Sequence, residues 1–183
     1  MRRIAMLSLR TEGSALVEFA IVLPLLVVFL VGIYDFSGAF NQKQKIEHAA
    51  QEGASIAATQ PLIDLDPATA NPVSLQPVAA VIANSLTAGN VLPQGGCAAP
   101  AGAYVSGLMW QYTISCGPDT LTIKIDRGVV GSGSPGLPVS LGTSVEVIYP
   151  YHWRFNSAIQ LLFPGASYTP AVLRETATVH NQL

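Results

Sequence analysis

An uncharged apolar run from Phe19 to Tyr34 constrains this chain more than any other feature. Three apolar residues before Glu18 extend it, so that a helix over residues 15–34 would be about 30 Å long, the thickness of the hydrocarbon core of a bilayer. Only 11% of the residues are charged, whereas soluble domains usually have about a quarter. The sequence therefore predicts a transmembrane helix over residues 15–34.

The flanks of this run predict its orientation. Glu18 lies in the first turns, near the headgroups, where a carboxylate costs less than at the bilayer centre. Pro24 is tolerated, because membrane helices can satisfy the carbonyl that a proline frees. Three arginines precede the run, which favours a cytoplasmic N-terminus and a head outside: Arg2, Arg3 and Arg10.

A cleaved secretory signal peptide is the first alternative. Ser37 and Ala39 are small enough for its cleavage site, which would leave Phe40 as the first residue. The apolar run is, however, longer than the usual signal-peptide core of about 7–15 residues.

Helical periodicity continues from residue 35 to 60, where apolar or small residues recur at steps of three and four and polar residues fill the other face. Pro61 predicts the end. We expect one helix over residues 14–60, whose amphipathic half, residues 35–60, packs on a head domain. His48 and Glu52 share one turn of it, but without a third ligand we expect no metal site.

Residues 61–183 are expected to form a β-rich head. A proline-rich linker precedes a short helix over residues 78–87, and residues 156–163 are an ambiguous helix. Alternating or β-branched segments predict antiparallel strands over residues 108–116, 120–127, 143–149 and 171–180. The predicted fold class is α+β, a long N-terminal helix packed on a small antiparallel sheet.

Cys97 and Cys116 are the only cysteines. In a head outside the cytoplasm we expect them to form a disulfide, which would contribute roughly 3 kcal/mol. The alternative is a pair of buried reduced thiols.

The remaining sequence features do not predict a catalytic or ligand-binding site. The glycine-rich segment 131–136 lacks the strand and helix of a dinucleotide site, so it is interpreted as a loop. A formal net charge of -2 does not favour nucleic-acid binding. We expect no catalytic residues, cofactor, metal or small-molecule substrate. The aromatic segment with Tyr151, Trp153 and Arg154 is either a partner surface or packing of the sheet against the helix.

A short basic leader ends at Gly13, and Glu18 follows five residues later at the start of the apolar run. With Phe19 and Pro24, this arrangement resembles the class III signal of the type IV pilin superfamily. More narrowly, Val-Glu-Phe-Ala-Ile-Val-Leu-Pro-Leu-Leu, Gly-Ile-Tyr-Asp and Ala-Ala-Gln-Glu-Gly-Ala resemble the TadE-like pseudopilins of the tight-adherence (Flp) pilus system. The resemblance covers residues 10–58.

The resemblance implies that a prepilin peptidase cuts between Gly13 and Ser14, so that residues 1–13 are a removable leader. Gly13 would let the backbone approach the peptidase closely. In a filament, Glu18 would accept the ammonium of a neighbouring subunit, since either charge alone is costly to bury. Alternatively, Glu18 only lies at the lipid surface and Gly13 only starts the helix.

The leading hypothesis is thus a minor pilin or pseudopilin precursor of a bacterial inner membrane, which acts in pilus assembly and possesses no enzymatic activity. The implied partners are the prepilin peptidase, the major Flp pilin, a companion pseudopilin, the assembly ATPase with its platform, and inner-membrane lipid. The alternatives are a membrane-anchored binding module without processing and a pseudopilin of a type II-like secretion system.

Overall fold

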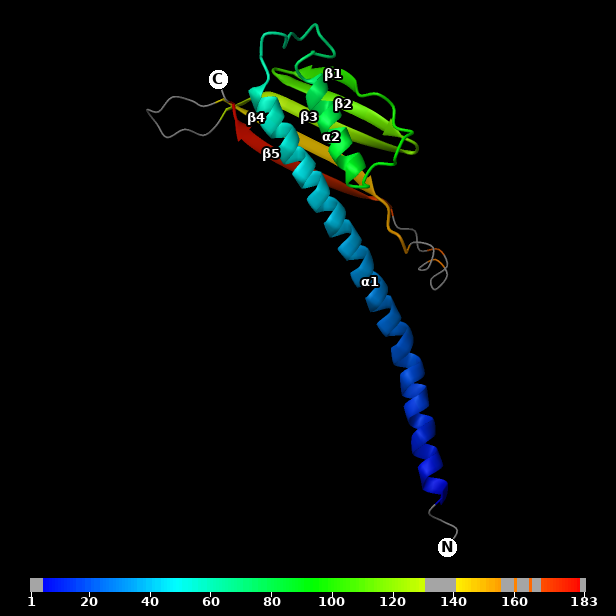
Figure 1. The fold of residues 1–183 in the computed structure, drawn as a ribbon. Coiled ribbons are helices and arrows are strands. Elements are labelled where there is room, and N and C mark those ends of the chain that lie inside the picture. Colours follow the sequence, from blue (N-terminus) through cyan, green and yellow to red (C-terminus); the bar gives the residue numbers. More distant parts are fainter. Residues whose placement is uncertain (1–4, 131–140, 156–159, 161–164, 166–168, 182–183) are drawn as a thin grey trace, which may run out of the picture. The chain divides into compact units, whose positions relative to one another are not determined.

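The computed structural model describes residues 5–130, 141–155, 160, 165 and 169–181, with side chains from residue 13 onwards. The chain divides into two compact units. The anchor unit comprises Met1–Ala39 and Arg154–Ser167, and the head unit comprises Phe40–Trp153 and Tyr168–Leu183. Helix α1 (Ala5–Thr59) contributes residues to both (Figure 1).

The anchor unit contains the apolar part of α1. Every residue from Gly13 to Leu30 is exposed, including all the large apolar side chains of this stretch. Within the described residues, the portion Gly13–Thr59 is the one helix long and apolar enough to cross a membrane. Its length and composition are compatible with a single-pass membrane anchor.

The start of α1 differs from the sequence-based prediction. The helix begins at Ala5, whereas we expected it to begin at Ser14. Gly13 costs a helix only about 1 kcal/mol, and Ala5, Met6 and Leu7 are good helix formers. The helix therefore runs without a break through Gly13.

The head unit contains one antiparallel sheet in which each strand pairs with the next along the chain, in the order β1-β2-β3-β4-β5. The alternation of β3 buries Leu121, Ile123 and Ile125 and leaves the residues between them half-buried. The strands are β1 (Ala101–Ser106), β2 (Met109–Cys116), β3 (Asp119–Val130), β4 (Leu141–Tyr151) and β5 (Ala171–His180).

Two helices cover one face of this sheet: the upper part of α1 and α2 (Gln76–Ala88) (Figure 1). Apart from Ile46, the buried stripe of α1 in the head unit consists of small residues, which are Ala49, Ala50, Gly53, Ala54, Ala57 and Ala58. A Cβ added at Gly53 would lie 2.6 Å from Cγ1 of Ile82 on α2, and closer still to its Cδ1. Glycine is therefore what permits this close approach of the two helices.

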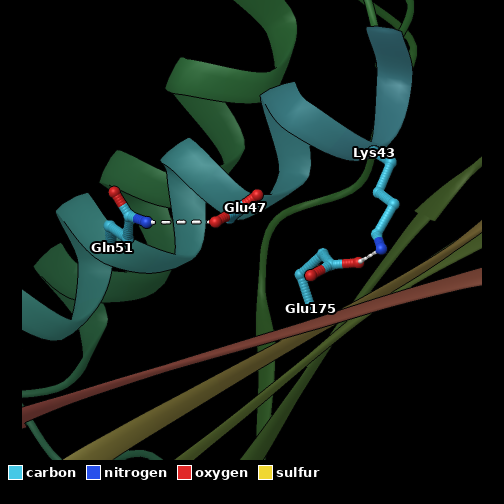
Figure 2. A network of polar contacts seen from close by, with 4 residues as sticks. All are labelled: Lys43, Glu47, Gln51 and Glu175. Carbon is cyan, nitrogen blue, oxygen red and sulfur yellow. Dashed lines mark hydrogen bonds and ion pairs between the residues drawn. The ribbon is translucent and has the colours of Figure 1, made fainter. Parts of the chain in front are cut away.

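The polar face of α1 also contacts the sheet. Figure 2 shows Lys43 of α1 and Glu175 of β5, whose Nζ and Oε1 atoms lie 3.3 Å apart. One turn further along, Gln51 donates a hydrogen bond of 3.4 Å to Glu47. Because the Lys43 side chain is half-exposed, this ion pair contributes at most about 1 kcal/mol, and it serves mainly to orient α1 over β5.

The opposite face of the sheet is polar. Glu146 on β4 accepts ion pairs from Lys124 on β3 at 3.1 Å and from Arg174 on β5 at 3.2 Å. Threonine and serine side chains surround these charges along β2 to β5. This face is thus suited to water, whereas the apolar residues face the helices.

A buried polar cluster lies where α1 ends. Arg127 of β3 is 1% exposed, and its Nη2 donates a hydrogen bond of 2.9 Å to the carbonyl of Gln60, just beyond the last turn. Burial lowers the pKa of Arg127, while the charge of Asp64 acts in the opposite direction. The pKa of the Tyr112 hydroxyl is raised to about 12, mainly by burial and secondly by the negative charge of Asp64.

Asp64 itself shows the reverse balance. Burial acts to raise the pKa of this carboxyl, but its hydrogen bonds outweigh burial and hold the pKa below the usual value. One of these bonds is donated by the backbone N–H of Ser74, at 2.7 Å. The cluster therefore combines the buried cation of Arg127 with the half-buried carboxylate of Asp64, and it ties the linker to the sheet and to the end of α1.

The α+β fold class is confirmed, and so is the disulfide, which joins Cys97 to Cys116. Strand β1 was missed, because its first half, Ala-Gly-Ala, has little intrinsic preference for a strand. The predicted helix 78–87 is α2, which begins two residues earlier with Pro77 in its first turn. The predicted loop 131–136 lies outside the described residues, as does all of the ambiguous segment 156–163 except Gln160.

Candidate processing and assembly site

The proposed cleavage position is open on the helix surface. Gly13 and Ser14 are both exposed, and a Cβ added at Gly13 would meet no atom within 4 Å. A Cβ added at Gly32, a half-buried glycine further along the same helix, also meets no atom within 4 Å. Among the described residues, no atom therefore opposes a larger side chain at either glycine.

Glu18 lies one turn after Ser14. The Ser14 hydroxyl donates to Oε1 of Glu18 over 3.4 Å, at the spacing where side chains four residues apart meet on a helix. Both residues are exposed, and Phe19 is 62% exposed beside them. The geometry thus places a carboxylate acceptor within reach of groups at position 14, beside a bare apolar surface.

Pro24 lies within α1, in the middle of the apolar run. Because proline has no N–H, the carbonyl of Ala20 loses its usual helical partner. In lipid that carbonyl would need a substitute donor, from a neighbouring helix or from water. Pro24 is therefore a position where contact with another helix would be favourable.

Asp35 is a functional candidate that the sequence analysis missed. It follows directly after the apolar run and is only 5% exposed. Its carboxylate accepts hydrogen bonds from the backbone N–H of Arg154 at 3.0 Å and of Phe155 at 3.3 Å. The rings of Tyr34 and Phe155 pack edge to face, 5.4 Å apart. The sequence offered two signals, the position of this acid at the end of the apolar run and its place in the Gly-Ile-Tyr-Asp motif.

The proposed partner surface is only partly accessible. Tyr151 is 3% exposed and packs against the ring of Trp153, with the ring centres 5.3 Å apart. The Trp153 indole donates to the carbonyl of Thr169 over 3.2 Å, and Arg154 is exposed. Packing thus accounts for Tyr151, and a partner surface made by these residues stays a prediction.

The structure brings few metal-ligating side chains together. Among the described residues, no group of three or more His, Cys, Asp or Glu side chains has the arrangement of a metal site, and His48 and Glu52 belong to no such group. His152 and Asp119 form a pair 2.7 Å apart on the head. This pair links the end of β4 to the start of β3.

Helix α1 contains the segment of the chain that matches a known protein family. Residues 13–55 match the model of the TadE-like protein family. The match begins at Gly13, includes Ser14, Glu18, Phe19 and Pro24, and extends into the small-residue stripe of α1. The TadE-like resemblance seen in the sequence is therefore confirmed over this segment. No curated protein and no solved structure matches the chain.

Proposed function

We propose that this TadE-like chain is the precursor of a minor pilin-like subunit, which a prepilin peptidase cuts between Gly13 and Ser14 and which acts in assembly of a Flp-type adhesive pilus. The observation that carries this proposal is the family match, which begins at Gly13 and covers the exposed apolar helix. In this function the chain is a structural component and a substrate of the peptidase, not an enzyme.

Cleavage would change the charge at the N-terminal end of α1. Residues 1–13 contain three arginines and one glutamate, so their loss subtracts 2 from the formal net charge of -2 and leaves -4. The basic residues that hold the N-terminus in the cytoplasm would be gone, and the helix would leave the bilayer more easily. The new ammonium at Ser14 would lie one turn from Glu18.

The apolar surface of the mature helix must remain shielded from water. Lipid covers it before assembly, and the helices of neighbouring subunits would cover it afterwards. Between packed helices the Glu18 carboxylate is costly to bury without a cation, and the Ser14 ammonium of a neighbouring subunit would offset that cost. The proposed partners follow: the prepilin peptidase, the major Flp pilin, a companion pseudopilin, and the assembly ATPase with its platform.

The test is the N-terminal sequence and intact mass of the full chain, recovered from membranes of cells with and without a prepilin peptidase. We expect a start at Ser14 only when the peptidase is present. Gly13→Leu should retain the leader, whereas Gly32→Leu, at a glycine with equally open surroundings, should be cut normally. An uncut wild-type chain in the presence of the peptidase would contradict the proposal, and a start at Phe40 would indicate a secretory signal.

A second variant separates processing from assembly. Glu18→Gln keeps the size of the side chain and removes its charge, so we expect normal cleavage but little or no pilus formation. Glu18→Asp, which keeps the charge, should retain more function. Normal pili in cells that have only the Glu18→Gln chain would exclude the charge-pairing role.

A further inference from the structure

The turn at Arg154 and Phe155 is fixed to α1 immediately after the apolar run. The carboxylate of Asp35 accepts both backbone N–H groups of this turn, and Phe155 packs against Tyr34. A carboxylate that is 5% exposed is costly unless it is hydrogen-bonded, and each buried N–H also needs an acceptor. The Asp35 carboxylate and the two backbone N–H groups of the turn thus satisfy each other's hydrogen-bonding requirement.

The depth of this turn follows from the length of the helix. If residues 15–34 fill the hydrocarbon core, the next residues lie in a headgroup layer roughly 5–7 Å thick, which corresponds to about four helical residues. Asp35 is the first of these residues. Whatever Asp35 binds through its carboxylate must therefore also lie in or beside the headgroup layer.

The chemistry of the turn suits that layer. Arg154 is exposed and carries the charge that pairs with lipid phosphates, and Tyr34 and Phe155 supply aromatic rings. In sequence, no charged residue occurs from Phe155 to Leu173, a stretch of 19 residues, whereas β3 has four charged residues among its 12. The sequence after Arg154 therefore contributes no charge that would be costly near lipid.

We propose that Tyr34, Asp35, Arg154 and Phe155 form an interfacial membrane contact, in which Asp35 holds the turn at Arg154 and Phe155 among the phospholipid headgroups on the head side of the bilayer. This inference rests on the membrane insertion of α1 and does not require cleavage after Gly13. Before assembly, this contact would hold the subunit to the bilayer at a second point besides α1. The molecule that these four residues contact is lipid, not another protein.

The test uses full-length protein in vesicles of phosphatidylethanolamine and phosphatidylglycerol. The probe is Trp153, the residue before Arg154, whose backbone lies within about 4 Å of that of Arg154. Lipids brominated near the headgroup end of the acyl chains should quench Trp153 emission, and lipids brominated near the methyl end should quench it much less. Trp153→Phe identifies the emission of Trp153, because Trp110 is buried in the head core.

Two variants test the part played by the turn. Asp35→Ala should reduce quenching by the shallow lipid, because the turn loses its acceptor, while Ser37→Ala, at an exposed position two residues further along α1, should not. Quenching that is unchanged in Asp35→Ala would overturn the role of Asp35. Absence of quenching, in protein whose α1 resists alkaline extraction, would overturn the lipid contact and leave the cleavage proposal untouched.

Discussion

The close crossing of α1 and α2 predicts that Gly53→Ala destabilises the head, although alanine is the better helix former. In an open helix the substitution would stabilise by about 1 kcal/mol. Here the new methyl group would lie 2.6 Å from Cγ1 of Ile82, which is fully buried and has little room to move. Overpacking of this kind costs typically about 1–3 kcal/mol. Subtracting the helix-propensity gain of about 1 kcal/mol leaves an expected net loss of up to about 2 kcal/mol.

The assay is urea unfolding of the full chain in detergent micelles, followed by tryptophan fluorescence, since Trp110 reports on the head core. Gly32→Ala is the matched control, because a Cβ at Gly32 meets no atom within 4 Å and lies outside the head unit. It should leave the unfolding of the head unchanged.

A double-mutant cycle with Ile82→Ala tests the cause. Ile82→Ala alone should cost about 2–5 kcal/mol, as for other buried large-to-small substitutions. In that background the clash is gone, so Gly53→Ala should become neutral or stabilising. If Gly53→Ala destabilises equally in both backgrounds, contact with Ile82 is not the reason for the glycine, and the reasoning is refuted.

Three further predictions concern the head and use the same unfolding assay. Replacing Cys97 and Cys116 together by serine should lower the free energy of unfolding by roughly 3 kcal/mol, and an unchanged midpoint would contradict a stabilising disulfide. Arg127→Met should cost about 1–3 kcal/mol, because the carbonyl of Gln60 loses its buried donor and the charge that acts on Asp64 is removed, and adding Asp64→Asn should recover part of the loss. The pKa of Tyr112 is about 12 in the folded head and about 10 when unfolded, so the unfolded chain loses its proton first and stability should fall between these pH values, by roughly 2–3 kcal/mol in all. Tyr112→Phe should abolish that part of the pH dependence, and an unchanged slope in this variant would contradict the assignment.

The anchor and the strongly patterned strands were predictable from sequence, because their signals are local. The apolar run sets the length of the membrane helix, and the alternation around Ile123 marks a half-buried strand. Gly13, Glu18 and Pro24 stood out because a carboxylate and a proline are costly beside or inside such a run.

The missed features depend on residues far apart in the chain. Asp35 binds a turn about 120 residues away, and Arg127 caps a helix end 67 residues away, so neither partner follows from neighbouring residues. Strand β1 is held by its pairing with β2, because the Ala-Gly-Ala of its first half has little strand preference of its own. The extension of α1 back to Ala5 reflects good helix formers on one side of a single glycine.

The bridge between Cys97 and Cys116 sets an order of events for a head that is exported as proposed. Thiols stay reduced in the cytoplasm, so the bond closes only after the chain has crossed the bilayer. Because it ties the segment before β1 to the end of β2, it completes the head at the edge of the sheet farthest from β5. The polypeptide would therefore cross the membrane before its covalent structure is complete. A head with the disulfide formed would identify a subunit that is already on the outer side of the bilayer.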